Sequence, residues 1–179
     1  VLLIVFLSIP VSAANAEKSN DIVILYTNDT HAYIDGPLSF DTIGALKKNL
    51  EKQYRYVLLV DAGDHLQGTA FGSMDQGASV LKLMNKAGYD LATPGNHEFD
   101  YGMDTFLERA REAEFPYLSC NLYHQEDGVR GENLLESFQA YHFGKDVVAF
   151  IGITTPETLV TSTPAYFQAE PGSFCYGLS

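Results

Sequence analysis

The chain has 179 residues, of which 46% are hydrophobic and 19% charged, a composition that excludes an intrinsically disordered protein. Its 11 Lys and Arg against 23 Asp and Glu give a net charge of −12, which argues against nucleic acid as a partner because phosphate contacts need a basic surface. A protein this acidic needs metal ions to bind phosphates, since it would otherwise repel them. No apolar run reaches the roughly 20 residues of a membrane span.

The first residues have the pattern of an export signal. Residues 1–11 are almost wholly apolar, and residues 14–16 (Ala-Asn-Ala) match an A-x-A cleavage site. We expect residues 1–16 to be a signal peptide truncated at its front, because no Met and no basic segment precede the apolar run. The mature chain would then be exported to a periplasm, a cell wall or the extracellular medium. The alternative is a buried N-terminal strand or helix.

Short apolar runs alternate with amphipathic segments along the rest of the chain. The patterns predict strands at residues 22–26, 56–60, 91–93, 116–120 and 147–153, and helices at residues 40–52, 79–87 and 104–113. This order, β-α-β-α-β-α-β, predicts an α/β fold with a largely parallel sheet and helical crossovers. Polar residues 123–136 are expected to form a surface excursion, and the chain after Ile153 a loop-like tail. Cys120 and Cys175 leave two alternatives open, a disulfide or two buried thiols.

Unusual polar residues directly follow each of the first three predicted strands. The segments are Asn28-Asp29-Thr30-His31, Asp61-Ala62-Gly63-Asp64-His65-Leu66-Gln67-Gly68 and Gly95-Asn96-His97-Glu98-Phe99-Asp100. Ligands of parallel α/β sheets bind beyond the carboxyl ends of the strands, so we expect the three segments to lie together. The gaps of 35 residues from Asp29 to Asp64 and 32 from Asp64 to Asn96 each leave room for one βα unit.

Four of these residues are candidate metal ligands. Asp29 and His31 are two residues apart, so in an extended segment both can face one point. A carboxylate oxygen and an imidazole nitrogen together suit Mn, Fe or Zn better than Ca or Mg. Asp64 follows Gly63, which lets the backbone turn tightly, and Asn96 offers a neutral amide oxygen.

A candidate acid stands next to these ligands. His97 precedes Asp100 by three residues, and a His held by a carboxylate is the usual arrangement of an oriented acid. We expect Glu98 to form a salt bridge or a supporting contact, and His65 to lie at the surface or in a supporting position. Nothing in the sequence gives His124 or His142 a role in the site.

Together these motifs resemble the calcineurin-like metallophosphoesterases, and within them the secreted 5′-nucleotidase and UDP-sugar hydrolase branch. Residues 115–119 and 152–158 also resemble that branch, and the likeness runs from about residue 22 to residue 167. The resemblance implies a partial four-layer αββα sandwich. On this interpretation, residues 17–179 are the N-terminal part of a catalytic domain that is incomplete at its C-terminus.

The resemblance also implies the roles of the residues. Two divalent ions (Mn, Zn, Fe or Co) would be held by Asp29 and His31 on the first metal, Asp64 on both and Asn96 on the second. His97, oriented by Asp100, would stabilise the transition state or assist the leaving group. A hydroxide activated by the two metals would attack the phosphate ester of an extracellular nucleotide or nucleotide-sugar.

The sequence departs from the family in one respect. The family completes its site with two downstream Gly-His segments, but His142 is the last His here and no Gly-His pair occurs. We therefore expect these residues alone to bind metal weakly and to be inactive, and the parent protein to be active. The alternatives are a 2′,3′-cyclic-nucleotide phosphodiesterase or 3′-nucleotidase, and a non-catalytic exported metal-binding surface module. No substrate-binding residue can be named from this sequence.

Overall fold

The computed structural model describes residues 17–170 and 173–179, so the expected signal peptide at residues 1–16 lies outside the described part. The helices are α1 (Phe40–Leu50), α2 (Ala70–Met74), α3 (Ala78–Ala87), α4 (Met103–Glu112) and α5 (Thr158–Thr161), with 3₁₀ turns η1 (His97–Phe99) and η2 (Pro164–Phe167). The strands are β1 (Ser19–Thr27), β2 (Tyr54–Asp61), β3 (Leu91–Ala92), β4 (Leu122–Glu126), β5 (Val129–Asn133), β6 (Phe138–Phe143), β7 (Asp146–Ile151), β8 (Gln168–Glu170), β9 (Ser173–Phe174) and β10 (Tyr176–Leu178). None of the helices within these ranges is long and apolar enough to cross a membrane.

A parallel sheet in the order β1-β2-β3 organises the first half of the chain. In its register, Thr27 pairs with Asp61, and Asp61 pairs with Ala92. The three strands therefore end level with one another. The segments that follow them leave the sheet at one edge, as the motif spacing predicts.

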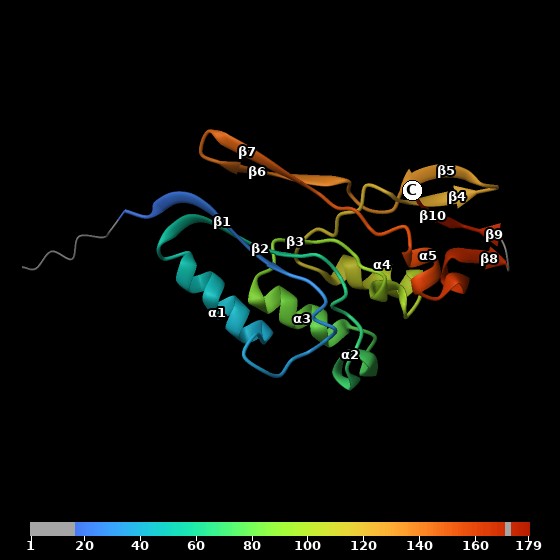
Figure 1. Ribbon diagram of the computed structural model, residues 1–179, viewed down its shortest axis with the longest axis horizontal. Helices are drawn as coiled ribbons and strands as arrows, with labels where there is room; N and C mark the ends of the chain where they lie inside the picture. Colours follow the sequence, from blue (N-terminus) through green and yellow to red (C-terminus); the bar gives the residue numbers. More distant parts are fainter. Residues whose placement is uncertain (1–16, 171–172) are drawn as a thin grey trace, which may run out of the picture.

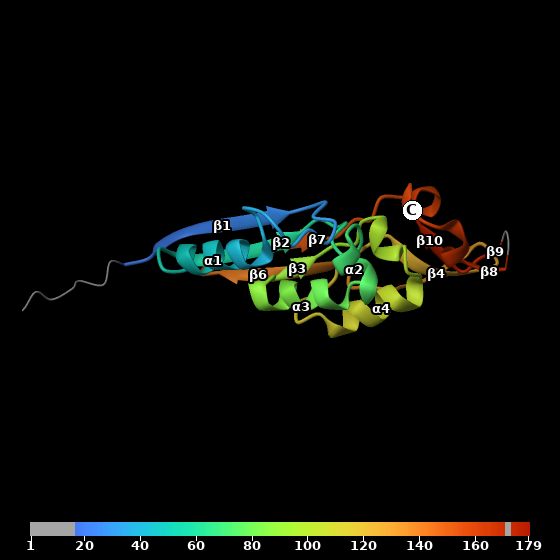
Figure 2. The ribbon, with the colours of Figure 1, turned by 90° about the horizontal axis from the view of Figure 1, so that it is seen from below.

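Helices α1 and α3 cover one face of this sheet, and the β6–β7 hairpin lies on the other side (Figure 1). Seen from the helix side, both helices lie in front of the strands (Figure 2). Their backbones approach closely, because a Cβ added at Gly44 of α1 would lie 2.9 Å from the Cα of Ala87 in α3. Ser39 caps α1 by accepting a hydrogen bond from the Thr42 N–H, which satisfies a free donor of the first turn. The α/β prediction is confirmed.

Two of the predicted strands differ from the prediction. Residues 116–120 form only single bridges, between Ala92 and Tyr117 and between Leu118 and Glu136. Residues 147–153 do not join the parallel sheet. Most of them form β7, which pairs antiparallel with β6 through the turn at Gly144 and Lys145. A two-residue turn connects antiparallel neighbours, so it removes the crossover that a parallel partner would need.

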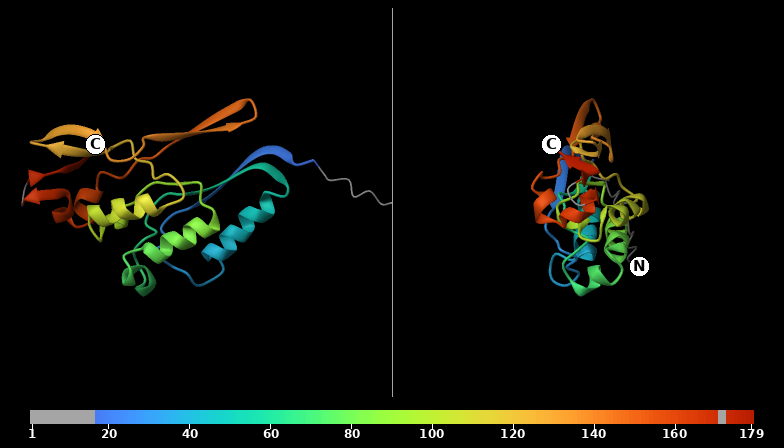
Figure 3. Two further views of the ribbon diagram at one scale, coloured as in Figure 1. Left: turned by 180° about the vertical axis from the view of Figure 1, so that it is seen from behind. Right: turned by 90° about the vertical axis from the view of Figure 1, so that its right-hand side faces the viewer.

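The segments expected to be irregular are partly ordered. Residues 123–136 contain the β4–β5 hairpin, which turns at Asp127 and Gly128, both with positive φ. The predicted tail contains α5, η2 and three short strands, and β10 pairs with β4. These elements gather at the end of the molecule away from α1 (Figure 3). Cys120 and Cys175 are both free thiols, so the structure holds no bridge between them.

The aromatic core lies beneath η1 and α4. Phe99, Phe106 and Phe167 are fully buried. The Phe99 ring centroid lies 4.9 Å from that of Phe106 and 5.3 Å from that of Phe167, and the Phe106 ring lies 5.5 Å from that of Tyr117. Phe99 thereby anchors η1, the turn that carries His97, to the core of the protein.

Truncation of Phe106 tests this core. We expect Phe106→Ala to lower the free energy of unfolding by about 3–5 kcal/mol, because it leaves a cavity between two aromatic rings. Urea denaturation followed by circular dichroism measures the change. Val160→Ala, at a side chain that is 75% exposed, is the control and should shift the midpoint little. Equal shifts in both variants would contradict this description of the core.

Candidate metal centre

The first two polar segments extend the sheet beyond its strands. The Asp29 N–H donates to the Gly63 carbonyl at 2.9 Å, and the His31 N–H donates to the Asp64 carbonyl at 2.8 Å. The loop after β1 is therefore fixed to the loop after β2 by its backbone. Side chains on both loops are brought to one place by the same hydrogen bonds that continue the β1–β2 pairing.

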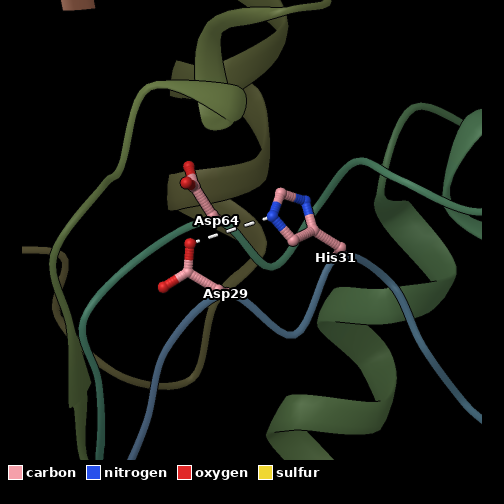
Figure 4. A group of neighbouring side chains, drawn as sticks. All are labelled: Asp29, His31 and Asp64. Atoms are coloured by element: carbon pink, nitrogen blue, oxygen red, sulfur yellow. Dashed lines mark ion pairs between the residues drawn. The ribbon is translucent and has the colours of Figure 1, made fainter.

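Asp29, His31 and Asp64 form a group of possible metal ligands (Figure 4). One ligand atom from each of the three lies within 4.8 Å of the others. The Nε2 atom of His31 is 3.8 Å from the Oδ1 atom of Asp29, and His31 Nδ1 faces the Gln67 carbonyl at 3.3 Å. Two carboxylates and an imidazole at this spacing are a donor set that fits a divalent cation of the Mn, Fe or Zn type.

The same three residues have left-handed backbone conformations. Their φ angles are 51° at Asp29, 47° at His31 and 60° at Asp64. Such angles are uncommon outside glycine and persist where the surroundings hold them in place. The backbone bonds between the two loops supply that restraint, so the loops turn their side chains to one side at a local cost in conformational energy.

The third segment approaches Asp64 directly. The His97 N–H donates to Asp64 Oδ1 at 2.9 Å. His97 Nδ1 lies 2.6 Å from Asp100 Oδ2, and the rings of His97 and His31 stand edge to face with centroids 5.2 Å apart. Asn96 directly precedes His97 and is partly exposed, and its side-chain amide makes no hydrogen bond to any residue that the structure describes. The predicted site residues thus gather at one edge of the sheet.

Burial and neighbouring charges shift two pKa values at the site. Burial raises the pKa of the Asp64 carboxyl above its usual range, although the His97 N–H works in the opposite direction. For His97, burial lowers the pKa, but the hydrogen bond and the charge of Asp100 outweigh it and raise the pKa overall. The imidazole of His97 is thereby stabilised in its protonated form, as an oriented acid needs.

A buried polar network underlies the site, and the sequence did not reveal it. His65 is fully buried, which excludes a surface position and leaves the supporting position, the other alternative that the sequence allowed. Its Nδ1 lies 2.7 Å from Asp61 Oδ1, and its Nε2 lies 2.6 Å from the Tyr117 hydroxyl. Burial alone lowers its pKa, but the carboxylates of Glu98 and Asp61 outweigh this and raise the pKa of His65 to about 9. The two buried carboxylates therefore favour the protonated form of the ring.

Glu98 is the second residue whose place the sequence left open. Its side chain is buried, and its carboxylate accepts hydrogen bonds from the backbone of both the second and the third segment. No local signal in the sequence could have found this role, because three of the four amides that Glu98 binds lie 32 to 34 residues away along the chain.

Gly63→Ala tests the close packing of the loops. A Cβ at Gly63 would lie 2.3 Å from the Gly95 N atom, so the two backbones would have to separate. We expect this variant to bind Mn²⁺ at least about tenfold more weakly, as measured by electron paramagnetic resonance of the free ion. Gly128→Ala is the matched control, because Gly128 also has positive φ but has no atom within 4 Å of the added Cβ. The same Mn²⁺ affinity in both variants would contradict the geometry.

Comparison with known proteins gives the family of the chain. Residues 22–162 match the family described as calcineurin-like phosphoesterase. The chain is 35% identical over 166 residues to the snake venom 5′-nucleotidase of Gloydius brevicauda, covering 83% of this chain and 28% of the relative. It is 32% identical over 165 residues to the 5′-nucleotidase of Vibrio cholerae, covering 88% of this chain and 29% of the relative.

A solved structure shows the same fold. The 5′-nucleotidase precursor of Thermus thermophilus superposes with a TM-score of 0.70 at 26% sequence identity, over 88% of this chain and 32% of that chain. The chain therefore spans about a third or less of the length of these proteins. Proteins of this family use divalent metals, and the Asp29, His31 and Asp64 group is a candidate site for them. From the match over residues 22–162, the chain belongs to the calcineurin-like phosphoesterase family.

Proposed function

We propose that the full-length protein carrying this chain is a metal-dependent phosphohydrolase of the 5′-nucleotidase type that acts on extracellular nucleotides. The observation that carries the proposal is that a group of possible metal ligands and a candidate acid lie together at one edge of the sheet. Possible ligand atoms of Asp29, His31 and Asp64 lie within 4.8 Å of one another, and the His97–Asp100 pair is hydrogen-bonded to the same Asp64. The relatives named 5′-nucleotidase support the substrate class.

The residues would hold two divalent ions. We assign Asp29 and His31 to the first ion, Asp64 to both and Asn96 to the second, which leaves Mn, Zn, Fe and Co as the candidates. When bound, such ions neutralise phosphate oxygens and lower the pKa of a water molecule. This assignment gives the first ion three ligands and the second two, so we expect the 179 residues on their own to bind metal weakly and to hydrolyse little.

His97 and Asp100 would act on the phosphate ester. Because Nδ1 of His97 is held by Asp100 at 2.6 Å, the ring is fixed in orientation and Nε2 is left to serve the substrate. While it is protonated, the His97 ring would stabilise the phosphate oxygens in the transition state through its positive charge. Transfer of the proton from Nε2 would then assist departure of the leaving alkoxide. Asp100 would orient His97 and would not itself touch the substrate.

The protein would be exported and would act outside the cytoplasm. Two observations support it: the apolar segment with its A-x-A pattern at residues 1–16, and relatives that include a protein of snake venom. The small-molecule substrate would then be a nucleotide or nucleotide-sugar outside the cytoplasm.

Substitution of Asp64 tests the function. In the full-length protein with Mn²⁺, we expect Asp64→Ala to lower kcat for AMP by about a hundredfold or more, because the variant loses the ligand assigned to both ions. Assays on AMP, UDP-glucose and 2′,3′-cyclic AMP side by side identify the substrate, and residues 17–179 alone are assayed as a further arm.

Asp41→Ala is the control, because Asp41 is an exposed aspartate on α1 whose recorded salt bridge is with Lys86 on the surface. We expect this variant to keep wild-type activity. Hydrolysis of AMP by Asp64→Ala at the wild-type rate would overturn the proposed function, and a preference for the cyclic substrate would move the protein to the phosphodiesterase alternative.

A further inference from the structure

We propose that Glu98 is a positioning residue, whose carboxylate fixes the loop after β2 against the loop after β3 and thereby sets the geometry of Asp64 relative to Asn96 and His97. The inference rests on the proposed metal site and adds to it a residue that binds neither metal nor substrate. It follows from the hydrogen bonds around Glu98, from its burial and from the close contact of the two loops.

The Glu98 carboxylate accepts four backbone hydrogen bonds. Oε1 accepts the His65 N–H at 2.8 Å and the Leu66 N–H at 3.1 Å. Oε2 accepts the Asp64 N–H at 2.7 Å and the Gly95 N–H at 2.7 Å. A single oxygen, Oε2, therefore bridges the two loops, and the carboxylate as a whole holds three successive amides of the Asp64 loop.

The hydrogen bonds close a ring around Asp64. Its N–H is held by Glu98, and its Oδ1 accepts the N–H of His97, which belongs to the same η1 turn as Glu98. Backbone and side chain of Asp64 are thus both attached to one short turn. A shift of η1 would move the carboxylate of Asp64 with it, so the distance between the two candidate metal positions depends on this turn.

The loops after β2 and β3 pack too closely for either backbone to shift relative to the other. A Cβ at Gly95 would lie 2.3 Å from Asp64 Oδ1, so the Gly95 backbone is in contact with the candidate ligand itself. Glu98 is only 1% exposed, and water cannot replace the carboxylate without opening the site. Hydrogen bonds to a buried carboxylate are among the stronger ones in proteins, and loss of the acceptor leaves buried donors without a partner.

Glu98→Gln in the full-length protein separates positioning from a merely structural role. Glutamine keeps one acceptor oxygen, but its NH₂ group would face two N–H donors and would break the contact with one pair of amides. We expect Mn²⁺ affinity to fall by about 10- to 100-fold in a calorimetric titration. At saturating Mn²⁺ we expect kcat for AMP to fall while KM changes less than twofold.

Asp90→Asn is the matched control for loss of an internal carboxylate. Asp90 Oδ2 accepts the Leu59 N–H at 2.7 Å and a bond from Lys47 Nζ at 2.7 Å, and Asp90 precedes β3 rather than following it, so it belongs to none of the three loops. We expect Asp90→Asn to lower the melting temperature without changing Mn²⁺ affinity. A purely structural Glu98 would behave in the same way, so wild-type Mn²⁺ affinity in Glu98→Gln would overturn the proposal.

Glu98→Asp keeps the test decisive if Glu98→Gln does not fold. Aspartate keeps the charge but is one methylene shorter, so it cannot span both loops, and we expect it also to lose Mn²⁺ affinity. Wild-type affinity in this variant would overturn the proposal.

Hydrogen exchange of the metal-free protein distinguishes failure of this inference from failure of the proposed function. The amides of Asp64, His65 and Gly95 should be protected in the wild type and lose protection together in the folded Glu98 variant. Unprotected amides in the wild type would overturn the inference. Protected amides in a protein that binds no Mn²⁺ would uphold the positioning of the loops and overturn the metal site.

Discussion

The rest of the structure depends on one constraint, which is that three parallel strands end at the same level of the sheet. Because Thr27, Asp61 and Ala92 lie side by side in the register, the segments that follow them start from one line. The hydrogen bond from the Asp29 N–H to the Gly63 carbonyl then continues the pairing past the strands. A shift of one residue in this register would turn the side chains of β2 to the opposite face and separate Asp29 from Asp64.

A network of buried polar side chains beneath the loops holds the aligned loops in one arrangement. Asp61 ends β2, is 2% exposed and accepts hydrogen bonds from the Gly63 N–H and the Thr27 hydroxyl. His65 lies between Asp61 and Glu98, and the protonated form of its ring, which these carboxylates favour, offsets buried negative charge. A network of this kind is costly if any member lacks its partner, so it specifies one arrangement of the loops. The candidate metal ligands above it are in contrast accessible to solvent, since Asp29 is exposed and His31 and Asp64 are partly exposed.

Much of this arrangement could be predicted from the sequence. The continuous apolar run at Val57 to Val60 indicates a buried strand, and the polar residues after it stand out against that background. The family resemblance supplied the roles of Asp29, His31, Asp64 and Asn96, which stay predictions until metal binding is measured. The structure confirms that the segments carrying these residues lie at one edge of the sheet, as the strand order predicts.

The hairpins and the buried network could not be predicted in the same way. The run at Val147 to Ile151 has the same composition whether its partner is parallel or antiparallel, and only the glycine turn at Gly144 indicates a hairpin. The Asp127–Gly128 pair carries a similar signal for the β4–β5 hairpin. Burial of His65 and Glu98 depends on contacts more than 30 residues away along the chain, which no local pattern records.

The central claim is that the three loops build one metal site at the sheet edge. A crystal structure of the full-length protein grown with Mn²⁺, with anomalous data collected at the manganese edge, tests this most directly. We predict a peak of anomalous density that contacts Asp29, His31 and Asp64, with a second peak shared between Asp64 and Asn96. A saturated crystal whose peaks lie elsewhere, with these side chains in contact only with water, would contradict the account.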